Sequence, residues 1–163
     1  MDKSHDGAAL AVGADRAAIA AGAAADGGAE AAAITATLVG QHERLGFLPR
    51  QFGPLFLLAE NVVYDTMGRL CPHYTSGYWD FFSLSNGGAF LAPRGVPAFR
   101  LVRDGEGFDG WFDAETAGIG VTAVALCKLS FGRDGARFAE SYYRLRDFID
   151  EHPESRRLYA LLD

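Results

Sequence analysis

The chain has 163 residues, 49% of them hydrophobic, so it is long enough for one domain with a buried core. Its formal charge is −6, from 15 Lys and Arg against 21 Asp and Glu. This balance disfavours a general nucleic-acid binder, which normally carries a basic patch. The chain also lacks the dense, nearly unopposed array of carboxylates that a protein mimic of DNA would need.

The N-terminal stretch differs from the rest of the chain. Residues 1–33 contain fifteen Ala and five Gly and no aromatic residue, so they have little apolar surface to bury. We expect a flexible tail at 1–33 and one folded domain at 34–163. The N-terminus does not fit a signal peptide, and no stretch reaches the apolar length of a membrane span. We therefore expect a cytoplasmic protein that does not bind membranes.

The first predicted helix begins near Pro54, which suits the first helical position after Gly53. Apolar residues then recur at helical spacing, and Pro72 ends the pattern. The residues expected to face inward are Leu55, Leu58, Ala59, Val62, Val63, Met67 and Leu70.

A β-hairpin is predicted next, with strands at about 78–84 and 89–93. Between them stands Asn86-Gly87, the dipeptide most typical of a tight turn with positive φ at both central residues. A third strand is predicted at 98–103, with Phe99 and Leu101 inward. Asp104-Gly105 predicts another tight turn before a fourth strand at 107–112.

The C-terminal part is predicted to be helical. Asp113 is a suitable N-cap for a helix in which Lys128 is the only charge between 117 and 131, so this helix, Val124 included, should be buried. Gly118 and Gly120 would let another element pack closely on it. Two further helices follow Asp134-Gly135 and Pro153. The predicted class is α+β: an antiparallel three- to four-stranded meander packed with about four helices.

The aromatic strand offers candidate binding residues. Rings at Tyr78, Trp79, Phe81 and Phe82 lie on both faces of the strand, and one face must pack on helices. The other face is either covered by the N-terminal segment or exposed. Core packing is the favoured interpretation, with a partner-binding patch as the alternative. The candidate partner-binding residues are Tyr78, Trp79, Asp80, Phe82 and Asn86.

No pattern in the sequence indicates catalysis, a cofactor or a metal. The four histidines are not spaced as zinc ligands, and neither a P-loop nor a Gly-x-Ser-x-Gly motif occurs. We therefore assign no catalytic, cofactor-binding or metal-binding residue. Cys71 and Cys127 are expected to be buried, reduced thiols.

The hairpin segment from Tyr74 to Pro93 combines an aromatic strand, Leu-Ser-Asn-Gly-Gly, and a short apolar strand ending in Ala-Pro. This order resembles the central motif of the ArdB/KlcA antirestriction family of plasmids and mobile elements. Other segments resemble further parts of the family, so that the resemblance covers residues 42–163. These segments are Arg44–Pro49, Phe52–Pro54, Val63–Tyr64, Met67, Leu70–Cys71, Asp113–Ala114, Ala117–Ile119, Phe148 and His152–Glu154.

The resemblance implies a non-enzymatic antirestriction protein that counteracts type I restriction–modification without DNA mimicry. Its partner would be host restriction machinery or a factor controlling it, without strong nucleic-acid binding. Two alternatives remain: a small enzyme with an unrecognised active site, and a DNA-binding accessory protein of a mobile element. The second would use Arg94, Arg100 and Arg103, which lie near the hairpin.

Overall fold

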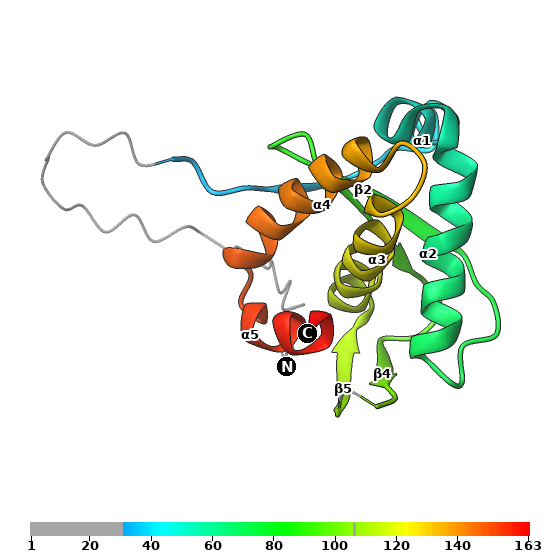
Figure 1. The fold of residues 1–163 in the computed structure, drawn as a ribbon, viewed down its shortest axis with the longest axis vertical. Coiled ribbons are helices and arrows are strands. Elements are labelled where there is room, and N and C mark those ends of the chain that lie inside the picture. The colour runs from blue at the N-terminus through cyan, green and yellow to red at the C-terminus, as the bar shows by residue number, and fades with distance from the viewer. Residues whose placement is uncertain (1–30, 106) are drawn as a thin grey trace, which may run out of the picture. The chain divides into compact units, whose positions relative to one another are not determined.

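The computed structural model describes residues 31–105 and 107–163 (Figure 1). The predicted α+β class is confirmed. The described elements, in chain order, are β1 Ala36–Leu38, α1 Arg44–Phe52, η1 Gly53–Leu55, α2 Phe56–Leu70, β2 Trp79–Leu84, β3 Ala89–Pro93, β4 Ala98–Arg103, β5 Phe108–Asp113, α3 Ala114–Ser130, α4 Gly135–Asp150 and α5 Ser155–Leu162. The tail expected at 1–33 lies almost wholly outside the described residues.

The helical region before the hairpin has two helices where the sequence predicts one. Pro54 lies in a short 3-10 turn, η1, and α2 begins at Phe56. The additional helix, α1, includes Pro49 and has poor helix propensity, but it buries Phe47 and Phe52 against the core. Leu58, expected to face inward, is 44% exposed, so the apolar face of α2 is narrower than predicted.

Three antiparallel strands form the first sheet, in the order β1-β2-β3. Phe81 pairs with Leu91 and Asp80 with Ala92 in the β2–β3 register. Strand β1 was not predicted, because its three residues give too short a pattern to distinguish from loop.

The turn of the β2–β3 hairpin differs from the predicted one. The Gly87 N–H donates to the Leu84 carbonyl at 2.9 Å, so Ser85 and Asn86 are the central residues. Gly87 follows with φ 84°, whereas Asn86 does not have positive φ. A three-residue loop closed by a left-handed glycine is the next commonest hairpin after the two-residue type. The prediction of positive φ at Asn86 was therefore wrong.

The second sheet contains β4 and β5 alone. The strands lie where the sequence places them, and Phe99 and Leu101 are buried as expected. They do not extend the first sheet, so the strands form two small sheets rather than one four-stranded meander.

Helix α3 is the centre of the core. Its N-cap is Asp113, whose carboxylate accepts a hydrogen bond from the Thr116 N–H at 2.8 Å. A Cβ on Gly118 would lie 2.4 Å from the Leu91 carbonyl oxygen, so only glycine lets β3 approach this closely. The Thr122 hydroxyl accepts a hydrogen bond from the Leu91 N–H at 3.1 Å. Helix α3 therefore covers the edge of β3 and satisfies its backbone.

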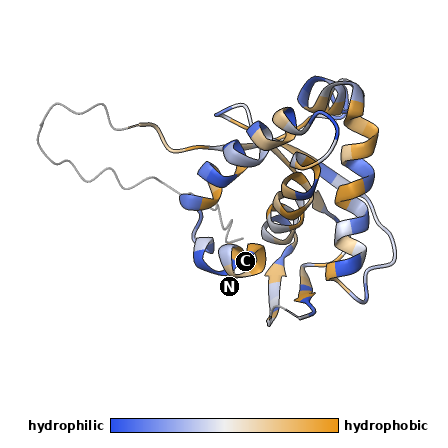
Figure 2. Cartoon of the chain, in the orientation of Figure 1, coloured by the Kyte–Doolittle hydropathy of each residue, from blue (hydrophilic) through white to orange (hydrophobic). Residues whose placement is uncertain are grey.

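Helices α4 and α5 pack on α3 with one face each. Phe138, Leu145 and Ile149 of α4 are completely buried, as are Leu158 and Leu161 of α5. Figure 2 shows the contrast: hydrophobic colour predominates along α3, while α4 alternates with hydrophilic residues. Within the described residues, none of the helices combines the length and hydrophobicity that crossing a lipid bilayer requires.

Both cysteines are free thiols. Cys71 is buried just after α2, as expected, whereas Cys127 on α3 is only half-buried. No disulfide therefore links these two residues, which are the only cysteines of the chain.

Candidate partner-binding surface

Trp79, at the start of β2, is part of the core. It is only 4% exposed, and its indole N–H donates to the Tyr74 hydroxyl at 2.7 Å. Its ring lies 5.0 Å from that of Tyr64 on α2. Burial is the main reason that the pKa of Tyr64 is raised, and a hydrogen bond to Glu60 adds to it. Trp79 therefore holds α2 and the loop before β2 together.

The other two rings of the strand pack on its opposite faces. Phe81 stacks on Phe47 of α1 with centroids 6.0 Å apart. On the opposite face, Phe82 stacks on Phe90 at 4.7 Å, and Phe90 stacks in turn on Phe148 of α4. Helix α1 thus covers Phe81 on one face of β2, while on the other face α4 packs on Phe90 of the neighbouring strand and the half-buried Phe82 leaves only part of its surface to solvent.

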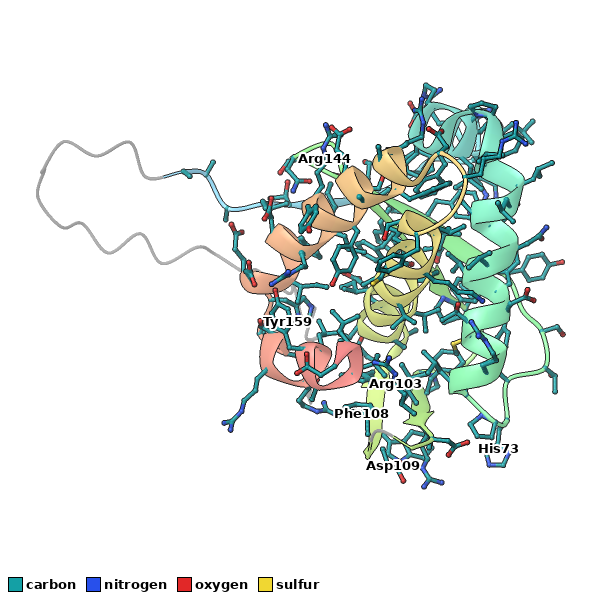
Figure 3. The ribbon with its side chains drawn as sticks, in the orientation of Figure 1. His73, Arg103, Phe108, Asp109, Arg144 and Tyr159 are labelled. Carbon is teal, nitrogen blue, oxygen red and sulfur yellow. The ribbon has the colours of Figure 1, made fainter. Side chains whose placement is uncertain are left out.

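Asn86 belongs to a second group of contacts at the tip of the hairpin. Its amide donates to the Arg144 carbonyl at 2.8 Å and accepts from the Gly88 N–H at 3.0 Å. The Gly87 carbonyl accepts from Arg144 Nη1 at 3.2 Å and from Gln51 Nε2 at 3.0 Å. Figure 3 shows Arg144 of α4 beside this turn. The tip is therefore docked on α1 and α4.

Tyr78 and Asp80 lie at the opposite end, where β2 begins. Tyr78 is 85% exposed. The Asp80 carboxylate accepts a hydrogen bond from Arg94 Nε at 2.6 Å and lies 3.9 Å from Arg44 Nη1. The hydrogen bond to Asp80, followed by its charge, raises the pKa of Arg94.

Arg44 has its own anchors in this region. Its second terminal nitrogen donates to the Trp79 carbonyl at 2.7 Å, and its guanidinium lies 4.3 Å above the ring of Phe81. Since Arg is favourable above an aromatic face, α1 presents this charge in a fixed position. The two arginines and the aspartate form a connected charged group.

These side chains line one hollow of about 360 Å³ at the open end of the hairpin. We call this the base surface, and define it as Leu38, Arg44, Tyr78, Asp80 and Arg94. It offers an exposed phenol, an apolar side chain and two oriented guanidinium groups, which suit contact with another protein. Among residues 31–105 and 107–163, no cluster of three or more His, Cys, Asp and Glu side chains could hold a metal.

The sequence interpretation did not include the two arginines of this surface among the candidate partner-binding residues; it named Arg94 only for the alternative of DNA contact. The predicted two-residue turn at Asn86-Gly87 would pair Asp80 with Pro93, whereas the observed register pairs Asp80 with Ala92 and so places Arg94 diagonally on the same face. Arg44 gave no local signal, since its helix was not predicted and its contacts span more than thirty residues of sequence.

Comparisons with known proteins agree with this architecture. A family profile described as "Antirestriction protein" matches residues 72–163. The Escherichia coli protein named Antirestriction protein KlcA is 40% identical over 135 residues, covering 80% of this chain and 95% of that protein. The uncharacterized protein YafX of E. coli K12 is 35% identical over 134 residues, covering 80% of this chain and 88% of YafX.

A solved structure is also similar, with a TM-score of 0.73 and 37% identity over 80% of this chain and 95% of that one. That structure is described as one of the KlcA and ArdB proteins, which show a novel fold and antirestriction activity against type I DNA restriction systems in vivo but not in vitro. The resemblance seen in the hairpin sequence is thereby confirmed. From the profile match, the identity and the shared fold together, the chain belongs to the antirestriction protein family.

Proposed function

We propose that this protein lets a mobile element escape type I restriction–modification in its host, and that it does so by binding a protein. The observation that carries this proposal is the 37% identity and TM-score of 0.73 to a solved chain described as active against type I systems. The match covers 95% of that chain, so the similarity extends beyond a single shared motif.

Charge argues against DNA mimicry as the mechanism. Residues 34–163 carry a formal charge of only −3, with acidic and basic residues interspersed. Double-stranded DNA has one negative charge per roughly 1.7 Å of axis. Some carboxylates that a DNA mimic would need to present are also neutralised by ion pairs with arginines, as Asp80 is by Arg94 and Asp109 by Arg100.

The base surface is our candidate for the contact. Tyr and Arg are enriched among the residues that contribute most to protein–protein affinity, and this surface presents one tyrosine and two arginines around a hollow. Asp80 pre-orients Arg94, so less side-chain freedom is lost on binding. Of the residues predicted from sequence, Tyr78 and Asp80 fit this role, while Trp79, Phe82 and Asn86 support the hairpin.

The partner is inferred from the behaviour of the relatives. Activity in cells but not in vitro is expected when the protein acts through a cellular component missing from the purified reaction. We propose that the partner is such a host factor, one that controls the restriction machinery, and that the protein meets it in the cytoplasm. On this proposal the protein is a binding protein and not an enzyme.

Plating of unmodified phage tests the function. Phage are plated on cells with a type I system, with and without this gene, and on cells lacking the system. We expect the gene to raise the plating efficiency only on the restricting cells. Unchanged plating on those cells, with soluble protein present, would contradict the proposal. A rise on both kinds of cell would show an effect unrelated to restriction.

A further inference from the structure

A second hollow opens between α2, α3, α4 and the end of β4. Its volume is about 420 Å³, within the range of roughly 300–1,000 Å³ typical of small-molecule sites. It shares no lining residue with the base surface. Its lining residues are Thr66, Arg69, Leu70, Val102, Arg103, Asp104, Val124, Cys127, Lys128, Phe131, Tyr142 and Leu162.

The floor of this cleft is an uncovered part of the central helix. Every residue of α3 from Thr116 to Leu126 is buried except Val124, which the sequence predicts to be buried as well. Val124 is half-exposed because it faces the cleft, where Leu70 and Leu162 also contribute apolar surface. Phe131, 87% exposed, adds an apolar edge. An apolar body placed here would cover surface that the fold itself leaves open to water.

The mouth of the cleft is cationic although the chain has a net charge of −6. Arg69 from α2, Arg103 from β4 and Lys128 from α3 line it, with Asp104 as the one carboxylate among the described lining residues. Arg103 is held by a hydrogen bond from its Nη1 to the Leu161 carbonyl at 2.8 Å. Figure 3 shows it between β4 and α5.

The two other cations are more available to a bound group. Arg69 donates one hydrogen bond to the Thr66 hydroxyl at 3.3 Å, which leaves other guanidinium N–H groups for a second acceptor. Lys128 forms no ion pair with any carboxylate among the residues that the structure describes. Two exposed cations thus flank an apolar floor.

Tyr142 of α4 supplies a further polar group. Its ring lines the cleft, and burial is the main cause of its raised pKa. A tyrosine phenol is protonated at neutral pH and the raised pKa favours this form further, so Tyr142 can donate a hydrogen bond to an acidic group.

We propose that this cleft binds a small amphipathic carboxylate, with its apolar chain on Val124 and Leu70 and its carboxylate between Arg69 and Lys128. This site is separate from the surface proposed to contact the host factor. The two can be tested independently, because no residue belongs to both.

Calorimetric titration of the full chain with sodium octanoate tests the proposal, with 1-octanol as the uncharged probe of the same chain length. We expect saturable binding of one octanoate and weaker binding of 1-octanol. Arg69→Glu and Lys128→Glu should each weaken octanoate binding about tenfold or more, because each removes a charge-assisted contact. Arg50→Glu, an equal charge change at an exposed position of α1 outside the cleft, should bind octanoate as the unaltered chain does.

Cys127 provides an independent readout in the unaltered protein. It lines the cleft, so octanoate should slow its modification by iodoacetamide, measured by peptide mass spectrometry. Cys71, 5% exposed and outside this cleft, is the internal control and should be unaffected. Absence of octanoate binding would overturn the proposal. So would equal binding by the charge variants, or unchanged labelling of Cys127 at saturating octanoate.

Discussion

The two ends of the β2–β3 hairpin share the same strands but have opposite surroundings. At the tip, the Asn86 side chain and the Gly87 carbonyl are hydrogen-bonded to α1 and α4. At the base, Tyr78 is 85% exposed, and the Arg94 guanidinium is bound to Asp80 but open to solvent. The tip is thus occupied by contacts within the fold, while the base has groups left for a partner.

The residues that identify the family therefore lie at the tip of the hairpin, whereas the residues available for partner binding lie at its base. Leu-Ser-Asn-Gly-Gly is the most recognisable part of the motif, and the structure uses it to dock the hairpin on helices. A sequence motif can therefore identify a fold correctly although its residues make contacts within the protein and none with a partner. The following predictions test this division, in order of decreasing expected effect on stability.

The largest effect on stability is expected when the packing of α3 against β3, which holds the whole hairpin, is disturbed. Gly118→Ala would bring a Cβ within 2.5 Å of the β3 backbone, at the Leu91 oxygen and the Ala92 Cα. Because backbone atoms cannot move aside as a side-chain end can, we expect a loss of about 3 kcal/mol in the free energy of unfolding. Urea denaturation followed by circular dichroism measures this, and antirestriction should fall with it.

Gly68→Ala is the matched control. Gly68 lies within α2 with nothing within 4 Å of its Cβ position. Alanine should leave stability unchanged or raise it by up to about 1 kcal/mol, because it favours helix over glycine. If Gly118→Ala were as stable as Gly68→Ala, the close approach of α3 and β3 would not be needed.

A smaller effect is expected at the tip. Asn86→Ala removes the hydrogen bonds to the Arg144 carbonyl and the Gly88 N–H. We expect a loss of about 1 to 2 kcal/mol, with antirestriction reduced only as far as the folded fraction falls. Asn61→Ala, at an exposed position of α2, is the control for the loss of an amide. If Asn86→Ala kept full stability but lost antirestriction, the tip would bind the partner, and the assignment of binding to the base alone would be wrong.

The sequence predicts much of this fold because its signals are local. The Asp113 cap and the strands around Leu101 follow from residues that are neighbours in sequence or in one element. Helix α1 and strand β1 could not be predicted, since one has poor propensity and the other has three residues. Tertiary burial decides both.

The candidate site was predictable only in part. Alternating rings identify a buried strand, but which ring remains exposed depends on the helices that cover each face, and these come from distant sequence. Tyr78 stays exposed because it precedes the strand and no helix covers it. The Arg44 contact depends on where α1 packs, which no local pattern encodes.

At the base, Tyr78→Ala should leave stability within about 0.5 kcal/mol of the unaltered chain, because so little of the side chain is buried. Plating efficiency on restricting cells should nevertheless fall toward the value without the gene. Tyr143→Ala, a 59% exposed tyrosine on α4, should keep full antirestriction. If both variants protected phage equally well, Tyr78 would not take part in the proposed contact.

The smallest effect on stability is expected from two arginine substitutions that resemble each other chemically. Arg94 pairs with the half-buried Asp80 at the base, and Arg100 pairs with Asp109 on the second sheet; both arginines are exposed to solvent. Since exposed ion pairs contribute little, Arg94→Gln and Arg100→Gln should both melt close to the unaltered chain. Only Arg94→Gln should lose antirestriction, because only Arg94 belongs to the base surface.

Direct contact with DNA predicts instead that both variants lose activity, and that the unaltered protein retards a DNA fragment in gel electrophoresis at physiological salt. We expect no such retardation. A loss of antirestriction in Arg100→Gln equal to that in Arg94→Gln would replace the protein-binding surface with an electrostatic mechanism spread over both sheets.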